Sequence, residues 1–182
     1  MARVFLSLGA NLGDRLAQLR RALDLLSAVE GVTLENTSRI YETEPWESAS
    51  GQLHDRSGWF LNCAVEIATS LSPESLLDRA QEIERALARV RSASTPEAKR
   101  FEPRALDIDI LLYGNRVISD SDRLQVPHLL MHERGFALRP LAELAPDLEH
   151  PALYRTIREL LEELEDEHEV ALADLPPRWH PV

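Results

Sequence analysis

Two aspartates, Asp107 and Asp109, stand two residues apart inside an otherwise apolar run that ends at a Tyr-Gly-Asn turn. The run is typical of a buried strand. Alternate strand residues share a face, so both carboxylates are expected on one face and Leu106, Ile108 and Ile110 on the other. Unpartnered neighbouring carboxylates are costly to bury. Their separation of roughly 6.5 Å along the strand can hold one or two magnesium ions about 4 Å apart, although ion pairs with nearby arginines explain the pair equally well.

The segment before the aspartates is basic, in a chain whose formal net charge is −11. Residues 85–104 hold six basic side chains against two acidic ones. Arginine guanidinium groups and metal-binding carboxylates together suit a polyphosphate. A local basic cluster in an acidic chain favours a small anion over a nucleic acid, so a nucleotide–magnesium site is indicated. The basic residues are Arg85, Arg89, Arg91, Lys99, Arg100 and Arg104.

Length and composition fit a single domain, residues 1–182, because 44% of the residues are hydrophobic. No apolar run approaches the roughly 20 residues that a membrane span needs, and the N-terminal residues lack a signal-peptide pattern. We therefore expect a cytoplasmic monomer that acts on small molecules, without nucleic-acid or membrane partners. The only cysteine, Cys63, lies in an apolar run and is expected in the core.

The hydrophobic pattern also predicts the elements that position these residues. Strands are expected at residues 4–8, 32–41, 60–69 and 106–112, and helices after residue 14 and over 72–90. Residues 9–14 are interpreted as a strand-to-helix turn, with Asp14 or Asn11 as the helix cap. They do not match a phosphate-binding loop, because no Gly-Lys-Ser/Thr sequence follows.

The predicted order is β-α-β-β-α-β, which indicates an α+β fold with a ferredoxin-like core. In that arrangement an antiparallel sheet has two helices on one face, and the other face is available for ligands. A hairpin at 116–118 and helices over 134–144 and 156–167 are expected to follow the core.

Several ordered motifs along the chain resemble those of a known family, the 6-hydroxymethyl-7,8-dihydropterin pyrophosphokinases of folate biosynthesis. The resemblance covers nearly the whole chain and rests on residues 8–14, 41–45, 60–62, 100–109, 126–128 and 134–136. It implies an enzyme that transfers the diphosphate of ATP to the hydroxymethyl group of the pterin, giving AMP and the pterin diphosphate. It also implies ATP as the co-substrate and two Mg²⁺ ions.

The resemblance further implies roles for individual residues. The matching catalytic positions are Asp107, Asp109, Arg89 and Arg104, of which the two aspartates are the metal ligands. The positions that match the ATP site are Gln81, Glu84, Arg91, Arg100, Ile110, His128 and Arg134. The positions that match the pterin site are Thr43, Pro45, Trp46, Phe60, Asn62 and Phe136. In this set the two phenylalanines sandwich the pterin ring and the asparagine binds its polar edge.

Simpler interpretations exist for some of these residues, and two other functions compete. Phe60 and Phe136 would be core residues in most proteins, whereas Asn62 inside an apolar strand needs hydrogen-bond partners. One rival function is another two-metal nucleotidyl transferase or cyclase on a ferredoxin-like scaffold. The other is a ligand-binding module without catalysis. Analysis of the reaction products separates these possibilities.

Overall fold

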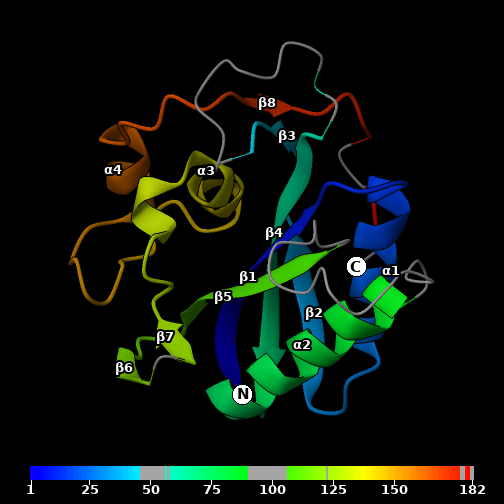
Figure 1. The fold of residues 1–182 in the computed structure, drawn as a ribbon. Coiled ribbons are helices and arrows are strands. Elements are labelled where there is room, and N and C mark those ends of the chain that lie inside the picture. Colours follow the sequence, from blue (N-terminus) through cyan, green and yellow to red (C-terminus); the bar gives the residue numbers. More distant parts are fainter. Residues whose placement is uncertain (46–55, 57, 90–105, 122, 177–178, 181–182) are drawn as a thin grey trace.

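The computed structural model describes residues 1–45, 56, 58–89, 106–121, 123–176 and 179–180 (Figure 1). The elements are β1 (Ala2–Ala10), α1 (Arg15–Ser27), β2 (Val32–Thr37), β3 (Tyr41–Thr43), β4 (Phe60–Thr69), α2 (Pro73–Arg89), β5 (Asp107–Tyr113), β6 (Ile118–Ser121), β7 (Leu124–Val126), a 3-10 turn (Met131–Glu133), α3 (Gly135–Leu144), α4 (Ile157–Glu162) and β8 (Val170–Leu172). The ferredoxin-like order is therefore present, with β3 added between β2 and β4. Among the described residues, no helix has both the length and the apolar character to cross a membrane.

The strands form an antiparallel six-stranded sheet in the order β5-β1-β4-β3-β8, and β2 also pairs with β4. The prediction of one strand over 32–41 was wrong, because β2 and β3 pair with different parts of β4. Ser38 lies at the break between them. Its backbone N–H donates to the carbonyl of Ala64 (2.9 Å), and its hydroxyl accepts from the Ala64 N–H (2.9 Å). The Ser38 hydroxyl thus replaces a backbone carbonyl as the partner of β4, at the point where the pairing between β2 and β4 ends.

Two apolar cores cover the two faces of the sheet. Val4, Leu6 and Leu8 of β1 belong to the core beneath α1 and α2. Phe5 of the same strand belongs to a second core with α3 and α4, which lie across the sheet from the first helix pair (Figure 1). This alternation follows from the period of two in a strand. The second core occupies only part of its face, so the polar residues described below lie beside it.

The start of the chain differs from the prediction at Gly9. The strand β1 continues through Ala10, because Gly9 pairs with both neighbouring strands, β4 and β5. The turn consists of residues 11–14, where Gly13 has a φ of +58°. Asp14 caps α1, as predicted, and its Oδ1 accepts from the Ala17 N–H at 3.0 Å.

The C-terminal part also departs from the predicted elements. The helix α4 ends at Glu162, although Thr156 and Glu159 form the capping box at its start. The predicted helix over 156–167 was therefore too long; beyond Glu162 the chain makes tertiary contacts instead, as when Asp166 accepts from the N–H of Gly135. The hairpin expected at 116–118 consists instead of β6 and β7, which pair with each other. The strand β8 was not predicted.

Candidate active site

The two aspartates lie on β5, at one edge of the six-stranded sheet. Asp107 pairs with Gly9 of β1, and Asp109 pairs with Ser7. Directly opposed residues point to the same face of an antiparallel sheet, so both carboxylates lie on the face away from α1 and α2. Ile108 between them is 3% exposed in the core beneath those helices. The predicted division of the two strand faces is confirmed.

The aspartate pair fits a magnesium site that a substrate completes. Both residues are half-buried, so their carboxylates are neither enclosed in the core nor fully solvated. Mg²⁺ is commonly held by one or two carboxylates, with phosphate oxygens and water as the other ligands. The described part of the chain has no group of three or more His, Cys, Asp or Glu side chains suited to a metal. A site of this kind would therefore depend on oxygens of the substrate.

Glu84 of α2 holds the backbone between the two aspartates. Its Oε1 accepts from the N–H of Ile108 at 2.7 Å. Because β5 is an edge strand, this outward amide has no neighbouring strand to bind. The helix α2 and the strand β5 are thereby joined at the residue that separates Asp107 from Asp109. Gln81 is half-buried three residues earlier, on the same side of the helix.

His128 is held against the strand that carries the aspartates. Its backbone N–H donates to the carbonyl of Leu111 at 2.9 Å. Its Nδ1 accepts from the N–H of Leu130 at 3.4 Å, which places the proton of the neutral ring on Nε2. Burial lowers the pKa of His128, opposed by the charge of Asp109 and reinforced by that of Arg134. Burial thus favours the neutral ring, in which Nε2 is the donor.

Arg134 and Phe136 flank the first residue of α3. The guanidinium carbon of Arg134 lies 5.7 Å from the centre of the Phe136 ring, as in a cation–π contact. Phe136 is half-buried and packs against the second core. Its ring thus lies at the border between that core and the rest of the sheet face, where it can serve both packing and stacking.

Asn62 is the third residue of β4 and is 4% exposed. Its Nδ2 donates to the hydroxyl of Thr43 on β3 at 2.6 Å, which satisfies part of its need for partners. Gly9 lies opposite, and a Cβ atom there would come within 2.5 Å of the Asn62 Oδ1. Phe60, half-buried, is on the same face and pairs with Thr43. The structure therefore brings the predicted pterin residues Thr43, Phe60 and Asn62 together.

The other predicted residues have more varied positions. Ile110 is 4% exposed in the core beneath α1 and α2, so only its backbone can face a ligand near the aspartates. Pro45 is half-buried after the buried Glu44. Arg89 is the last residue of α2, and its side chain lies outside the described residues. The predicted residues that lie wholly outside the described part are Trp46, Arg91, Arg100 and Arg104.

Sequence reasoning missed two residues of this face. Gly9 was assigned to a turn, although it lies between Asp107 and Asn62 in one row across three strands. Ser7 is 5% exposed beside Asp109 and received no role. The sequence did contain a signal for them. Ser7 and Gly9 stand at alternate positions of an apolar strand, so they interrupt the apolar surface of one strand face only.

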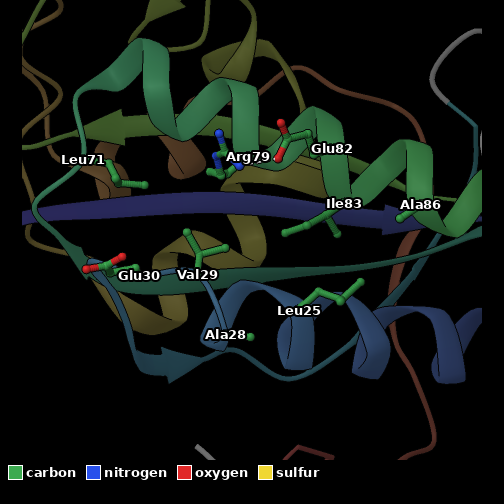
Figure 2. A pocket seen from close by; sticks show the side chains of 9 residues that line it. All are labelled: Leu25, Ala28, Val29, Glu30, Leu71, Arg79, Glu82, Ile83 and Ala86. Carbon is green, nitrogen blue, oxygen red and sulfur yellow. Dashed lines mark hydrogen bonds and ion pairs between the residues drawn. The ribbon is translucent and has the colours of Figure 1, made fainter.

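A groove on the helix-covered side of the protein is separate from this site. Figure 2 shows it between α1 and α2, with apolar side chains such as Leu25, Val29 and Ile83 and a charged pair at its rim. The pair is Arg79 and Glu82, 2.6 Å apart. Among the residues that the structure describes, none of the predicted site residues lines this groove. Of the charged side chains that line it, Arg79 is already paired with Glu82, and Glu30 is the other acidic residue.

Comparison with known proteins gives consistent results. A model of the 7,8-dihydro-6-hydroxymethylpterin-pyrophosphokinase family matches residues 5–146. A 2-amino-4-hydroxy-6-hydroxymethyldihydropteridine pyrophosphokinase of Methylorubrum extorquens is 42% identical over 165 residues, which cover 91% of this chain and 95% of the relative. The protein of the same name in Bacillus subtilis is 43% identical over 148 residues, which cover 81% of each chain.

Solved structures agree on the fold. A Plasmodium falciparum HPPK-DHPS crystal structure with pterin and p-hydroxybenzoate matches with a TM-score of 0.68 at 20% identity. The match covers 89% of this chain and 43% of that longer one. Fold and site together define an α+β protein of the ferredoxin-like class, whose edge strand β5 carries two carboxylates on the sheet face opposite α1 and α2. The chain belongs to the 7,8-dihydro-6-hydroxymethylpterin-pyrophosphokinase family.

Proposed function

We propose that the sheet face between β5 and the start of α3 carries out the reaction of this family, with the ATP phosphates over β5 and the pterin over β4. The reaction follows from family membership. The chain is an ATP-dependent diphosphotransferase of folate biosynthesis that acts on 6-hydroxymethyl-7,8-dihydropterin. Its products are AMP and the pterin diphosphate.

One observation supports this placement most directly: Asp107, Gly9 and Asn62 form a single row across β5, β1 and β4. Two strand spacings separate the carboxylate from the amide, which is roughly 10 Å. Gly9 has no side chain between them. A flat heterocycle that binds Asn62 can thus extend its hydroxymethyl group along the row toward Asp107.

Each half of the site then has a defined task. Asn62, oriented by Thr43, binds the polar edge of the pterin, and Phe60 and Phe136 stack on its ring. Asp107 and Asp109 hold two Mg²⁺ ions, which when bound neutralise phosphate charge and acidify the acceptor hydroxyl.

The groups around the phosphates complete the proposal. His128 donates from Nε2 to a phosphate oxygen, and Arg134 supplies positive charge beside it. The predicted contributions of Arg89, Arg91, Arg100 and Arg104 to the triphosphate site belong to the same proposal. Asp109 is a candidate to accept the proton of the attacking hydroxyl.

The test is a product analysis with ATP, Mg²⁺ and 6-hydroxymethyl-7,8-dihydropterin. We expect equal amounts of AMP and pterin diphosphate, and no product after chelation of the metal. Release of pyrophosphate would favour a nucleotidyl transferase or cyclase instead, and binding without turnover would favour a ligand-binding module. Asn62→Ala should raise the KM for the pterin more than the KM for ATP. Equal effects on both constants would contradict the placement of the pterin over β4.

We also propose that residues 1–182 act as one domain and as a monomer, without nucleic acid. The net charge of −11 supports the last point, because it disfavours contact with a phosphate backbone. The expected cytoplasmic location stays a prediction.

A further inference from the structure

The segment that follows α4 contacts the start of α3 through a buried carboxylate. Asp166 has a side chain that is only 2% exposed, although the glutamates around it, Glu165 and Glu167, are exposed. Its Oδ2 accepts from the N–H of Gly135 at 2.7 Å. Its Oδ1 accepts from the backbone N–H of His168 at 3.0 Å and lies 2.6 Å from Nδ1 of the same residue. Both carboxylate oxygens are therefore committed to fixed partners.

The helix α3 needs such a group, because it has no side-chain cap of its own. Its N-cap residue is Arg134, whose side chain makes no capping hydrogen bond and cannot accept one. Asp166 supplies the missing acceptor and a negative charge at the positive end of the helix. It binds the N–H of the one residue that stands between Arg134 and Phe136.

The same segment also fixes the other wall of the site. Four residues after Asp166, Val170 pairs with Thr43 of β3, next to Asn62. A Cβ atom on Gly135 would come within 3.2 Å of Val170 and 3.1 Å of Asp166. The backbone of Gly135 therefore packs closely against the segment 166–170. Residues 166–170 therefore join the start of α3 to the strand that orients Asn62.

We propose that Asp166 is a positioning residue for the pterin half of the site. By binding Gly135 it sets the first turn of α3, and thus the ring of Phe136, at a fixed distance from Thr43 and Asn62. This inference rests on the proposed placement of the pterin. It concerns a segment beyond residues 5–146, the part that the family model matches.

The test is a double-mutant cycle on pterin affinity, measured with a non-hydrolysable ATP analogue present. Asp166→Ala should weaken pterin binding about fivefold, and Phe136→Ala should weaken it further. Because Asp166 acts through Phe136, adding Asp166→Ala to Phe136→Ala should cost less than twofold more. A merely structural role predicts that the two losses multiply, which would overturn the proposal.

Matched variants control for stability. Asp147→Ala removes another aspartate of the C-terminal part, 81% exposed and paired with Arg158, and should leave pterin affinity unchanged. Asp166→Asn keeps one acceptor, so it should recover part of the affinity. If Asp166→Ala does not fold, Asp166→Ser carries the test, because its side chain is too short to bind the Gly135 N–H. Normal pterin affinity in that variant, in folded protein, would refute the role of Asp166.

The two proposals fail in different ways. If Phe136→Ala leaves pterin affinity unchanged, the pterin has been placed wrongly and the proposed function is at fault. If Phe136→Ala weakens binding while every Asp166 variant binds normally, only the positioning role is refuted.

Discussion

Replacement of Gly9 by alanine should damage the pterin site without affecting the phosphate site. The added Cβ would lie 2.5 Å from the Oδ1 of Asn62, whereas ordinary contacts begin at 3.4 Å. Asn62 must therefore move by roughly 1 Å. It cannot do so freely, because it is 4% exposed and its Nδ2 is bound to Thr43 at 2.6 Å.

The size of the effect follows from these contacts. Overpacking of a buried site costs about 1–3 kcal/mol, and loss of the Asn62–Thr43 hydrogen bond contributes about 1 kcal/mol within that range. Gly9 has no positive φ, so backbone strain adds nothing. If Asn62 moves by the roughly 1 Å that the added Cβ requires, pterin affinity should fall about tenfold or more, since 1.4 kcal/mol corresponds to a factor of ten.

The assay is titration of the pterin and, separately, of an ATP analogue, together with thermal unfolding of each variant. In the Asn62→Ala background the clash disappears, so Gly9→Ala should then have little further effect on stability. The reasoning is refuted if Gly9→Ala binds pterin normally, or if it destabilises the protein equally with and without Asn62.

Three other predictions concern charged groups. Asp107→Asn and Asp109→Asn should each remove nearly all turnover at saturating Mg²⁺ while the protein stays folded, as judged by activity and circular dichroism; near-normal activity in either would contradict the metal assignment. Glu84→Ala should raise the Mg²⁺ concentration needed for half-maximal rate and lower stability by about 1–3 kcal/mol, whereas Glu84→Gln, which keeps an acceptor for Ile108, should be close to wild type. Glu143→Gln should lower stability by about 1 kcal/mol at pH 7, allowing for solvent screening, and denaturant titrations should show this difference vanish in acid.

The pH dependence for Glu143 follows from its partners. Burial alone would raise its pKa, but hydrogen bonds from Arg39 and Tyr41 outweigh burial and lower it. Burial, followed by the hydrogen bond to Glu143, raises the pKa of Tyr41 to about 12. A carboxyl whose pKa is lowered on folding stabilises the protein at any pH above the pKa that it has in the unfolded chain. That stability is lost as the pH falls through the pKa that it has in the folded protein. A difference that persisted unchanged in acid would contradict the ion pair as its cause.

Local patterns predicted much of the fold. The strand β4 lies at the predicted residues, and α2 and α3 begin and end within a residue or so of the expected positions. Asp107 and Asp109 were placed on the correct face because alternation along a strand is a property of the chain itself. The second face of the sheet was expected to be free for ligands, but α3 and α4 cover part of it with an apolar core of their own.

The missing parts depend on residues that are distant in sequence. Nothing near Val170 shows that it will pair with Thr43, because an edge strand of only three residues has almost no periodic signal. Asp166 looked like one more carboxylate in an acidic run, and only its contact with Gly135 distinguishes it. Gly9 resembled a turn residue because glycine is common in turns, although its partners in β4 and β5 keep it in the strand.

The position of β3 has a consequence for the order in which the site is completed during synthesis. The carboxylate strand β5 needs only β1 beside it, and both are present once residue 113 has been made. The strand β3, by contrast, lies between β4 and β8, and β8 ends at residue 172. Chains grow from the N-terminus. A nascent chain would thus have both aspartates in place about 60 residues before it could add β8 beside β3, the strand that orients Asn62 in the proposed pterin site.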